Sequence, residues 1–187
     1  DPYPLMWLAK GLYKISLTGT DDEKYKNAYK DAIGAMAKCF KIDKDSSCFN
    51  THREFVDEFQ MSLVERVSNA VSQDKPKDAA TWATKFYKIT THIIGPKYIE
   101  AAAKYRAADK GGAAALWKEC DKLMVSITEI ESWTIADKHL FRIGVLMTAD
   151  CFVAARQKEK AVELLNKVAQ WFEEDADFKA HYDEIVN

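Results

Sequence analysis

The chain has 187 residues, of which 48% are hydrophobic and 30% are charged, and its formal net charge is −2. This composition is typical of a folded globular protein and excludes an intrinsically disordered chain. Because acidic and basic residues are interleaved without a basic stripe, we expect no binding to nucleic acid. The uncharged stretch 143–149 is far shorter than the ~20 apolar residues of a transmembrane helix, so we expect no membrane span.

The spacing of apolar residues predicts the fold class. They recur three or four positions apart along almost the whole chain, and no β-alternation bounded by turn residues is present. This periodicity predicts an all-α fold, in which residues 1–187 form a single domain, an antiparallel bundle of about eight to nine helices. In chain order we expect helices at about 4–16, 20–41, 51–72, 76–93, 97–108, 113–131, 134–155 and 158–173, and a short last helix with Phe178, Tyr182 and Ile185.

Local patterns suggest where these helices begin and end. Gly95-Pro96 predicts the end of the fourth helix, and Gly111-Gly112 predicts the break between the fifth and the sixth. Three capping-box patterns predict helix starts, at Thr20–Glu23, Thr51–Glu54 and Thr134–Asp137.

The segment 135–155 is apolar nearly all round, which predicts a buried helix at the centre of the bundle. Arg142 and Asp150 are its charged residues within the apolar run. Because an unpaired buried charge is costly, each needs a partner or a strip of solvent. A structural ion pair or a solvent strip is the ordinary interpretation, and a lined cavity or a partner's surface is the functional one.

The sequence has four cysteines, Cys39, Cys48, Cys120 and Cys151, and begins at Asp1 without a methionine. A processed start with an even number of cysteines favours a secreted or organelle-lumen protein with disulfide bonds. A cleaved expression tag and ordinary buried thiols are the alternatives. We expect Cys39 to be bonded to Cys48, because they flank a helix end. We expect Cys120 and Cys151 to be buried near one another, with a disulfide between them slightly favoured over two free thiols.

One polar segment resembles a calcium-binding loop. Asp43, Asp45, Ser47 and Glu54 stand at ligand positions of a twelve-residue EF-hand loop, in which Glu at the last position gives two oxygens. Cys48, however, occupies the place that demands glycine, and a capped helix start explains the same residues. Of the four histidines, His92 and His139 lie near predicted core faces and are candidate haem ligands; no zinc spacing is present.

No nucleophile–base arrangement, phosphate-binding loop or dinucleotide motif can be identified, so the sequence leans away from an enzyme. It is rich in aromatic residues, with five Trp, eight Tyr and nine Phe. Aromatic side chains between helices can line a cavity for an apolar ligand, although they are also ordinary core residues. We expect the cavity to lie between the sixth and seventh helices, lined by Leu123, Ile127, Ile143, Leu146 and Met147.

Besides an enzyme of a class that no motif identifies, two functions remain open. The first is a non-enzymatic soluble binding protein that holds an apolar small molecule, such as a lipid, a pigment or haem, between its helices. The second is a structural or interaction subunit that docks a partner protein through an exposed helix face. The apolar segment 3–8 favours the second, because it is apolar on more than one side.

Overall fold

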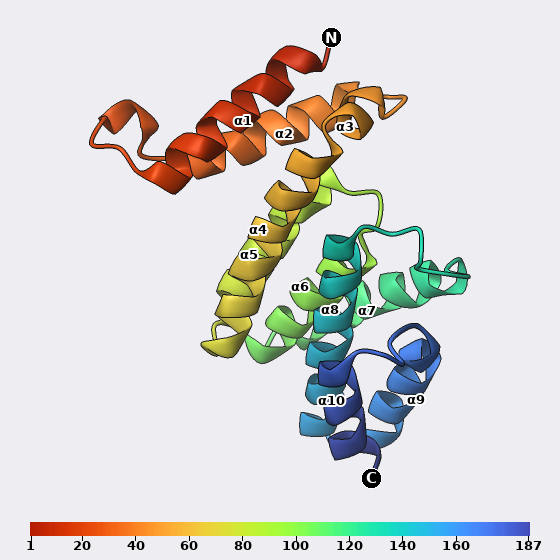
Figure 1. The fold of residues 1–187 in the computed structure, drawn as a ribbon. Coiled ribbons are helices and arrows are strands. Elements are labelled where there is room, and N and C mark those ends of the chain that lie inside the picture. The colour runs from red at the N-terminus through yellow and green to blue at the C-terminus, as the bar shows by residue number, and fades with distance from the viewer. The chain divides into compact units, whose positions relative to one another are not determined.

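The computed structural model describes all residues, 1–187, and its regular elements are all helices (Figure 1). It is 79% helical and has ten α-helices, three short 3₁₀ turns and no strand. The predicted all-α helical bundle is therefore confirmed, with one more short helix than expected. None of the helices combines the length and the apolar character that crossing a membrane requires.

The chain divides into two compact units, Asp1–Ser62 and Leu63–Asn187. The boundary falls inside helix α4 (Arg53–Ser72), which contributes residues to both units. The expectation of one domain stays a prediction.

The first unit is built on the helix pair α1 (Tyr3–Thr18) and α2 (Ala28–Ile42), which pack along one another (Figure 1). A 3₁₀ turn, η1 (Glu23–Tyr25), connects them, and the five-residue helix α3 (Ser47–Thr51) precedes α4. Four aromatic rings form the centre of its core, with neighbouring centroids 5.3–6.2 Å apart: Tyr13, Tyr29, Phe55 and Phe59.

Two of the predicted capping boxes, both in this unit, are wrong. Near Thr20 the cap is Asp22, which accepts a hydrogen bond from Lys24 N at 2.9 Å and starts only the turn η1, so α2 begins later, at Ala28. Thr51 lies at the end of α3, where its hydroxyl donates to the carbonyl of Ser47 at 2.8 Å. These polar side chains bond locally in turns, which is the usual competitor of a helix cap.

The second unit is arranged around α8 (Ile135–Ala154), against which α6 (Ile94–Arg106), α9 (Lys158–Val168) and α10 (Ala176–Val186) pack (Figure 1). Leu140, Phe141 and Val145 of α8 have no exposed surface. The predicted central helix is thus confirmed. The remaining elements of this unit are α5 (Pro76–Phe86), η2 (Tyr87–Ile89), α7 (Lys110–Val125) and η3 (Ala169–Trp171).

The third capping box marks the start of α8 as predicted. The Thr134 hydroxyl accepts a hydrogen bond from Asp137 N at 3.1 Å and donates one to the Asp137 carboxylate at 2.8 Å. The hydroxyl of Thr90 donates to the other oxygen of this buried carboxylate at 2.6 Å. The cap therefore also ties α8 to the segment that precedes α6.

Gly95-Pro96 and Gly111-Gly112 each lie in the first turn of a helix and do not follow the end of one. Gly95 and Pro96 belong to α6, where the missing N–H of proline removes no intrahelical bond. Gly111 and Gly112 belong to α7, which Asp109 caps by accepting from Gly112 N at 2.9 Å. Gly95 is therefore not the end of the fourth helix. The predicted break between the fifth and sixth helices is present, but it lies at 107–109, just before Gly111.

Arg142 and Asp150, the charged residues within the apolar part of α8, form ion pairs with the C-terminal segment. Arg142 donates to Asp175 at 3.1 Å and to Asp177 at 2.9 Å. Asp150 pairs with His181 of α10 at 2.7 Å. Structural ion pairing, the ordinary interpretation of these charges, is what the structure contains, and it holds α10 on α8.

Candidate functional site: a groove between α7 and α9

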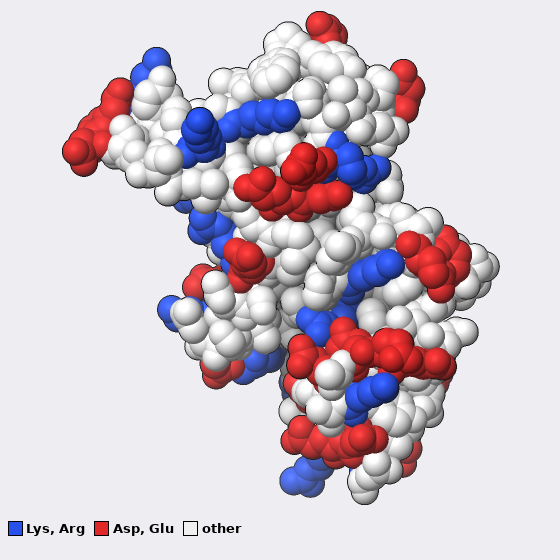
Figure 2. Space-filling view, in the orientation of Figure 1, with Lys and Arg blue, Asp and Glu red and all other residues white.

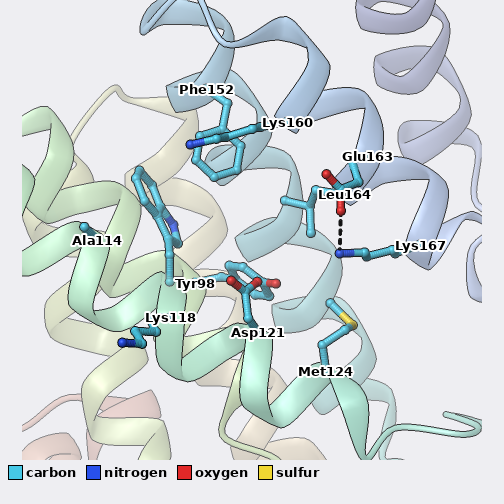
Figure 3. Close-up of a pocket in the computed structure, with 11 residues that line it drawn as sticks. Tyr98, Ala114, Lys118, Asp121, Met124, Phe152, Lys160, Glu163, Leu164 and Lys167 are labelled. Carbon is cyan, nitrogen blue, oxygen red and sulfur yellow. Dashed lines mark ion pairs between the residues drawn. The ribbon is translucent and has the colours of Figure 1, made fainter.

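The α7–α9 groove consists of two neighbouring pockets, lined mainly by side chains of α6, α7, α8 and α9, and Figure 3 shows the first of them. The two pockets share Ala114, Trp117, Phe152 and Lys160. We call the first, of about 330 Å³, the Tyr98 half; it is lined also by Tyr98, Lys118, Asp121, Met124, Glu163, Leu164 and Lys167. We call the second, of about 560 Å³, the Arg156 half; it is lined also by Tyr105, Lys110, Ala154, Ala155, Arg156 and Gln157.

Aromatic rings form the apolar part of the groove. The ring of Trp117 on α7 lies 4.7 Å from that of Phe152 on α8 and 5.8 Å from that of Tyr105 on α6, between centroids. Its indole N–H donates to the hydroxyl of Thr148 at 3.2 Å, which fixes the orientation of the ring. Three helices therefore present a preformed aromatic surface to whatever enters.

The hydroxyl of Tyr98 is the unusual polar group of the site. Tyr98 is only 2% exposed, lines the groove, and its hydroxyl oxygen has no hydrogen-bond partner. Burial, with a smaller contribution from nearby Cys120 and Asp121, raises the pKa of this hydroxyl, so it stays protonated and able to donate. A buried hydroxyl without a partner costs about 1–3 kcal/mol, a cost that a bound ligand group can remove.

Charge is unevenly distributed along the groove. The Arg156 half is lined by three bases, Lys110, Arg156 and Lys160, and by no acid. The Tyr98 half contains two acids, Asp121 and Glu163, and three bases, Lys118, Lys160 and Lys167; Glu163 is paired with Lys167 at 2.9 Å (Figure 3). On the face shown in Figure 2, acidic and basic side chains are otherwise mixed within each unit. A chain of net charge −2 therefore carries a locally basic pocket.

The five residues expected to line a ligand cavity are placed differently. Leu123, Ile127 and Leu146 pack partly buried against the hydrophobic core of the second unit, and Ile143 is partly buried on α8. Met147 lines a separate pocket beside Cys151. None of the five lines the α7–α9 groove, and ligand binding among them stays a prediction.

The sequence contained one signal for the groove, the aromatic residues at 105, 117 and 152. Their spacing placed them on helices without showing that these faces meet. The contribution of α9 was not anticipated, because Lys160 and Lys167 look like ordinary solvated charges of an amphipathic helix.

All four cysteines are free thiols, so the predicted disulfides are not present. The sulfurs of Cys39 and Cys48 are 4.0 Å apart, about twice the length of a disulfide bond. The Cys151 thiol contacts the carbonyl of Ala102 in α6 at 3.8 Å. Cys120 is buried on α7 in the hydrophobic core that also contains Tyr98. No bond joins these two cysteines.

The segment that resembles a calcium loop is a capped turn. The two carboxylate oxygens of Asp43 accept hydrogen bonds from Cys48 N at 3.1 Å and Phe49 N at 2.9 Å. Asp45 accepts one from Ser47 N at 3.0 Å. These oxygens bond the backbone, and no group of three His, Cys, Asp or Glu side chains is arranged to hold a metal ion.

The two candidate haem ligands have local partners as well. The ring of His92 stacks on that of Trp133, with centroids 4.2 Å apart. His139 is hydrogen-bonded to Arg142 at 3.2 Å. Neither histidine lines the α7–α9 groove.

Comparison of the chain with protein-family models, with curated proteins and with solved structures found no match. The groove must therefore be interpreted from its own chemistry.

Proposed function

We propose that this protein is a non-enzymatic binding protein that holds a small molecule with a flat apolar body in the α7–α9 groove. The observation that carries the proposal is the aromatic surface formed by Tyr105, Trp117 and Phe152 in a preformed groove. Ligand pockets usually enclose about 300–1,000 Å³ and combine apolar walls with a few polar groups. Both halves of the groove, at about 330 and 560 Å³, are within that range.

The geometry favours a flat ligand body over a branched one. Aromatic pairs gain energy at ring-centroid separations of about 4.5–7 Å, and a planar ligand can stack against the groove rings in the same way. The bond from Trp117 to Thr148 holds the indole in place before a ligand arrives. A pre-oriented ring loses little conformational freedom on binding, which favours affinity.

A neutral fluorescent aromatic, N-phenylnaphthylamine, tests this proposal, because its emission rises when it leaves water for an apolar site. We expect saturable binding with one site per chain. Ala114→Trp should abolish it, because exposed Ala114 lines both halves of the groove. Its neighbour Ala115 is also exposed and lines neither half, so Ala115→Trp is the matched control and should bind normally.

The same probe separates the groove from the cavity expected in the sequence. Leu146→Trp should abolish binding if the ligand lies among Leu123, Ile127, Ile143, Leu146 and Met147, and should leave it unchanged if the ligand lies in the groove. Loss of binding in Leu146→Trp together with normal binding in Ala114→Trp would move the site to those five residues. Circular dichroism of each variant shows whether the fold is intact.

A second function, docking of a partner protein, is favoured by α1. Trp7 and Leu8, neighbours on α1, are 61% and 52% exposed and form an apolar patch on the surface of the helix. We propose an apolar helix of a partner protein as the occupant of this face. The expected result is a stable hetero-complex on gel filtration that the double variant Trp7→Glu, Leu8→Glu no longer forms. If the native protein from its natural source elutes as a monomer without a partner, the docking proposal is contradicted.

A further inference from the structure

The three bases of the Arg156 half are available to a ligand. Lys110, Arg156 and Lys160 form no ion pair, and the only close electrostatic contact of Lys110 is with the ring of Tyr105, 6.0 Å from its centroid. Four lysines of the chain form ion pairs: Lys26, Lys97, Lys104 and Lys167. Three cations that line one pocket repel one another, and an anion between them would relieve that repulsion.

The opposite end of the groove has a mixed charge. Asp121 lies beside Tyr98 there, Glu163 is on the rim, and Lys118, Lys160 and Lys167 also line it (Figure 3). A ligand anion at this end would meet two carboxylates as well as bases, whereas the Arg156 half contains no acid. The unpartnered hydroxyl of Tyr98, 2% exposed, instead offers a hydrogen bond to a neutral acceptor such as a carbonyl, ether or hydroxyl oxygen.

The aromatic surface lies between these two ends, since Trp117 and Phe152 belong to both halves. In Figure 3, Lys160 and Phe152 are at one end of the Tyr98 half and Tyr98 and Asp121 are farther along it. A molecule that stacks on the rings can therefore reach the bases with one end and Tyr98 with the other.

We infer that the ligand of the groove is an aromatic anion, bound with its acidic group among Lys110, Arg156 and Lys160 and a neutral oxygen at the hydroxyl of Tyr98. This inference rests on the proposed function and adds to it the charge and the orientation of the ligand. The acidic group is a carboxylate, sulfate or phosphate, because all three present oxygens to ammonium and guanidinium groups.

Two probes with the same rings test the charge. Anilinonaphthalene sulfonate is N-phenylnaphthylamine with an added sulfonate, so the ratio of their dissociation constants isolates the effect of the anion. We expect the native protein to bind the sulfonate about tenfold more tightly at low ionic strength, as two or three charges a few ångströms away would provide. The preference should shrink at high salt, because exposed charges are screened.

The charge variant is Arg156→Gly with Lys160→Met. Arg156 has a φ of 60°, in the left-handed region that favours glycine, so this change removes the charge without disturbing the turn after α8. Its matched control is Ala108→Gly with Lys77→Met: Ala108 has a φ of 66°, and Lys77 is exposed and remote from the groove lining. We expect the ratio of dissociation constants to fall close to one in the charge variant and to keep its native value in the control.

The outcomes separate this inference from the function on which it rests. Equal affinity of the native protein for both probes, or a preference that survives in the charge variant, overturns the anion assignment and leaves the groove as a neutral aromatic site. Failure of both probes to bind the native protein contradicts the proposed function and the inference together. A Tyr98→Phe variant tests the orientation: with a hydroxylated aromatic carboxylate as ligand, it should lose affinity about fivefold or more.

Discussion

Gly144 of α8 lies directly against Gly95 of α6: a β-carbon built on Gly144 would be 2.6 Å from the carbonyl oxygen of Gly95. The same β-carbon would be 2.7 Å from Cβ of Tyr98, and one built on Gly95 would be 2.5 Å from the backbone nitrogen of Phe141. The two helices therefore touch through their backbones. This contact sets the position of Tyr98 under the α7–α9 groove.

Gly144→Ala should destabilise the protein, because a backbone on the other side cannot move aside as a flexible side chain can. We expect a loss of about 1–3 kcal/mol, or somewhat more, in the free energy of unfolding measured with urea. Gly111→Ala is the control in the same unit, since nothing lies within 4 Å of a β-carbon there. It should be neutral or slightly stabilising, by up to ~1 kcal/mol. Equal stability of the two variants would contradict the close α6–α8 contact.

Thr90→Val should show how much the hydrogen bond from Thr90 stabilises the buried Asp137 carboxylate. The change keeps the shape of the side chain but removes the hydroxyl that donates to Asp137 at 2.6 Å and accepts from His92 N at 2.9 Å. We expect a cost of about 1–3 kcal/mol near neutral pH. Thr90→Ser, which retains the hydroxyl, should cost much less.

The cost of Thr90→Val should also depend on pH. Burial, partly offset by the bonds from Thr90 and Thr134, raises the pKa of Asp137 above its usual 3.8 even in the native protein. Removing a donor to the carboxylate raises that pKa further. A raised carboxyl pKa lowers stability as pH rises through the usual value, so the variant should lose least in acid and most at neutral pH. A cost that is the same in both conditions would contradict the role of the hydroxyl as a donor to the ionised carboxylate.

His181→Gln should weaken the attachment of α10 in a pH-dependent way. The hydrogen bond and charge of Asp150 raise the pKa of His181 above its usual 6.5, against a smaller opposing effect of burial. A histidine with a raised folded pKa adds stability that is fully present below the unfolded value and is lost as pH rises through the folded value. The stability difference between native protein and variant should therefore be largest at mildly acidic pH, at up to ~1 kcal/mol, and vanish in alkali. A difference that grows with pH would refute the pairing.

Thiol titration with a coloured disulfide reagent should give little reaction in the native protein and four equivalents after unfolding, since the structure has four free cysteines. All four are buried, and burial raises the pKa of Cys39 to about 12 and that of Cys151 to about 11, so little thiolate is present. Two or no equivalents after unfolding without reductant would show that disulfides form in the material examined, with Cys39 and Cys48 the nearest candidates at 4.0 Å.

The sequence by itself was sufficient for the helical content, the central position of α8 and the start of that helix at Thr134. These properties are local: apolar spacing shows which face of a helix is buried, and a capping side chain bonds residues three positions away. The need of Arg142 for a partner was likewise visible, because the cost of burying a charge does not depend on which residue neutralises it. Asp150, whose side chain is 58% exposed, does not have this need. The predicted helix starts at Thr20 and Thr51 were wrong, because polar side chains there form local hydrogen bonds with the backbone and do not cap the predicted helix.

Only the tertiary structure decided which buried faces meet. Periodicity assigns Trp117, Phe152 and Lys160 each to a helix, but it contains no information on the distance between helices, so the cavity was expected around Leu146. The close backbone contact at Gly95 and Gly144 brings α6 against α8, and α9 then packs on the same helix. In the sequence Tyr98 is one of eight tyrosines. That it is buried with an unpartnered hydroxyl depends on the packing of α6 against α7 and α8.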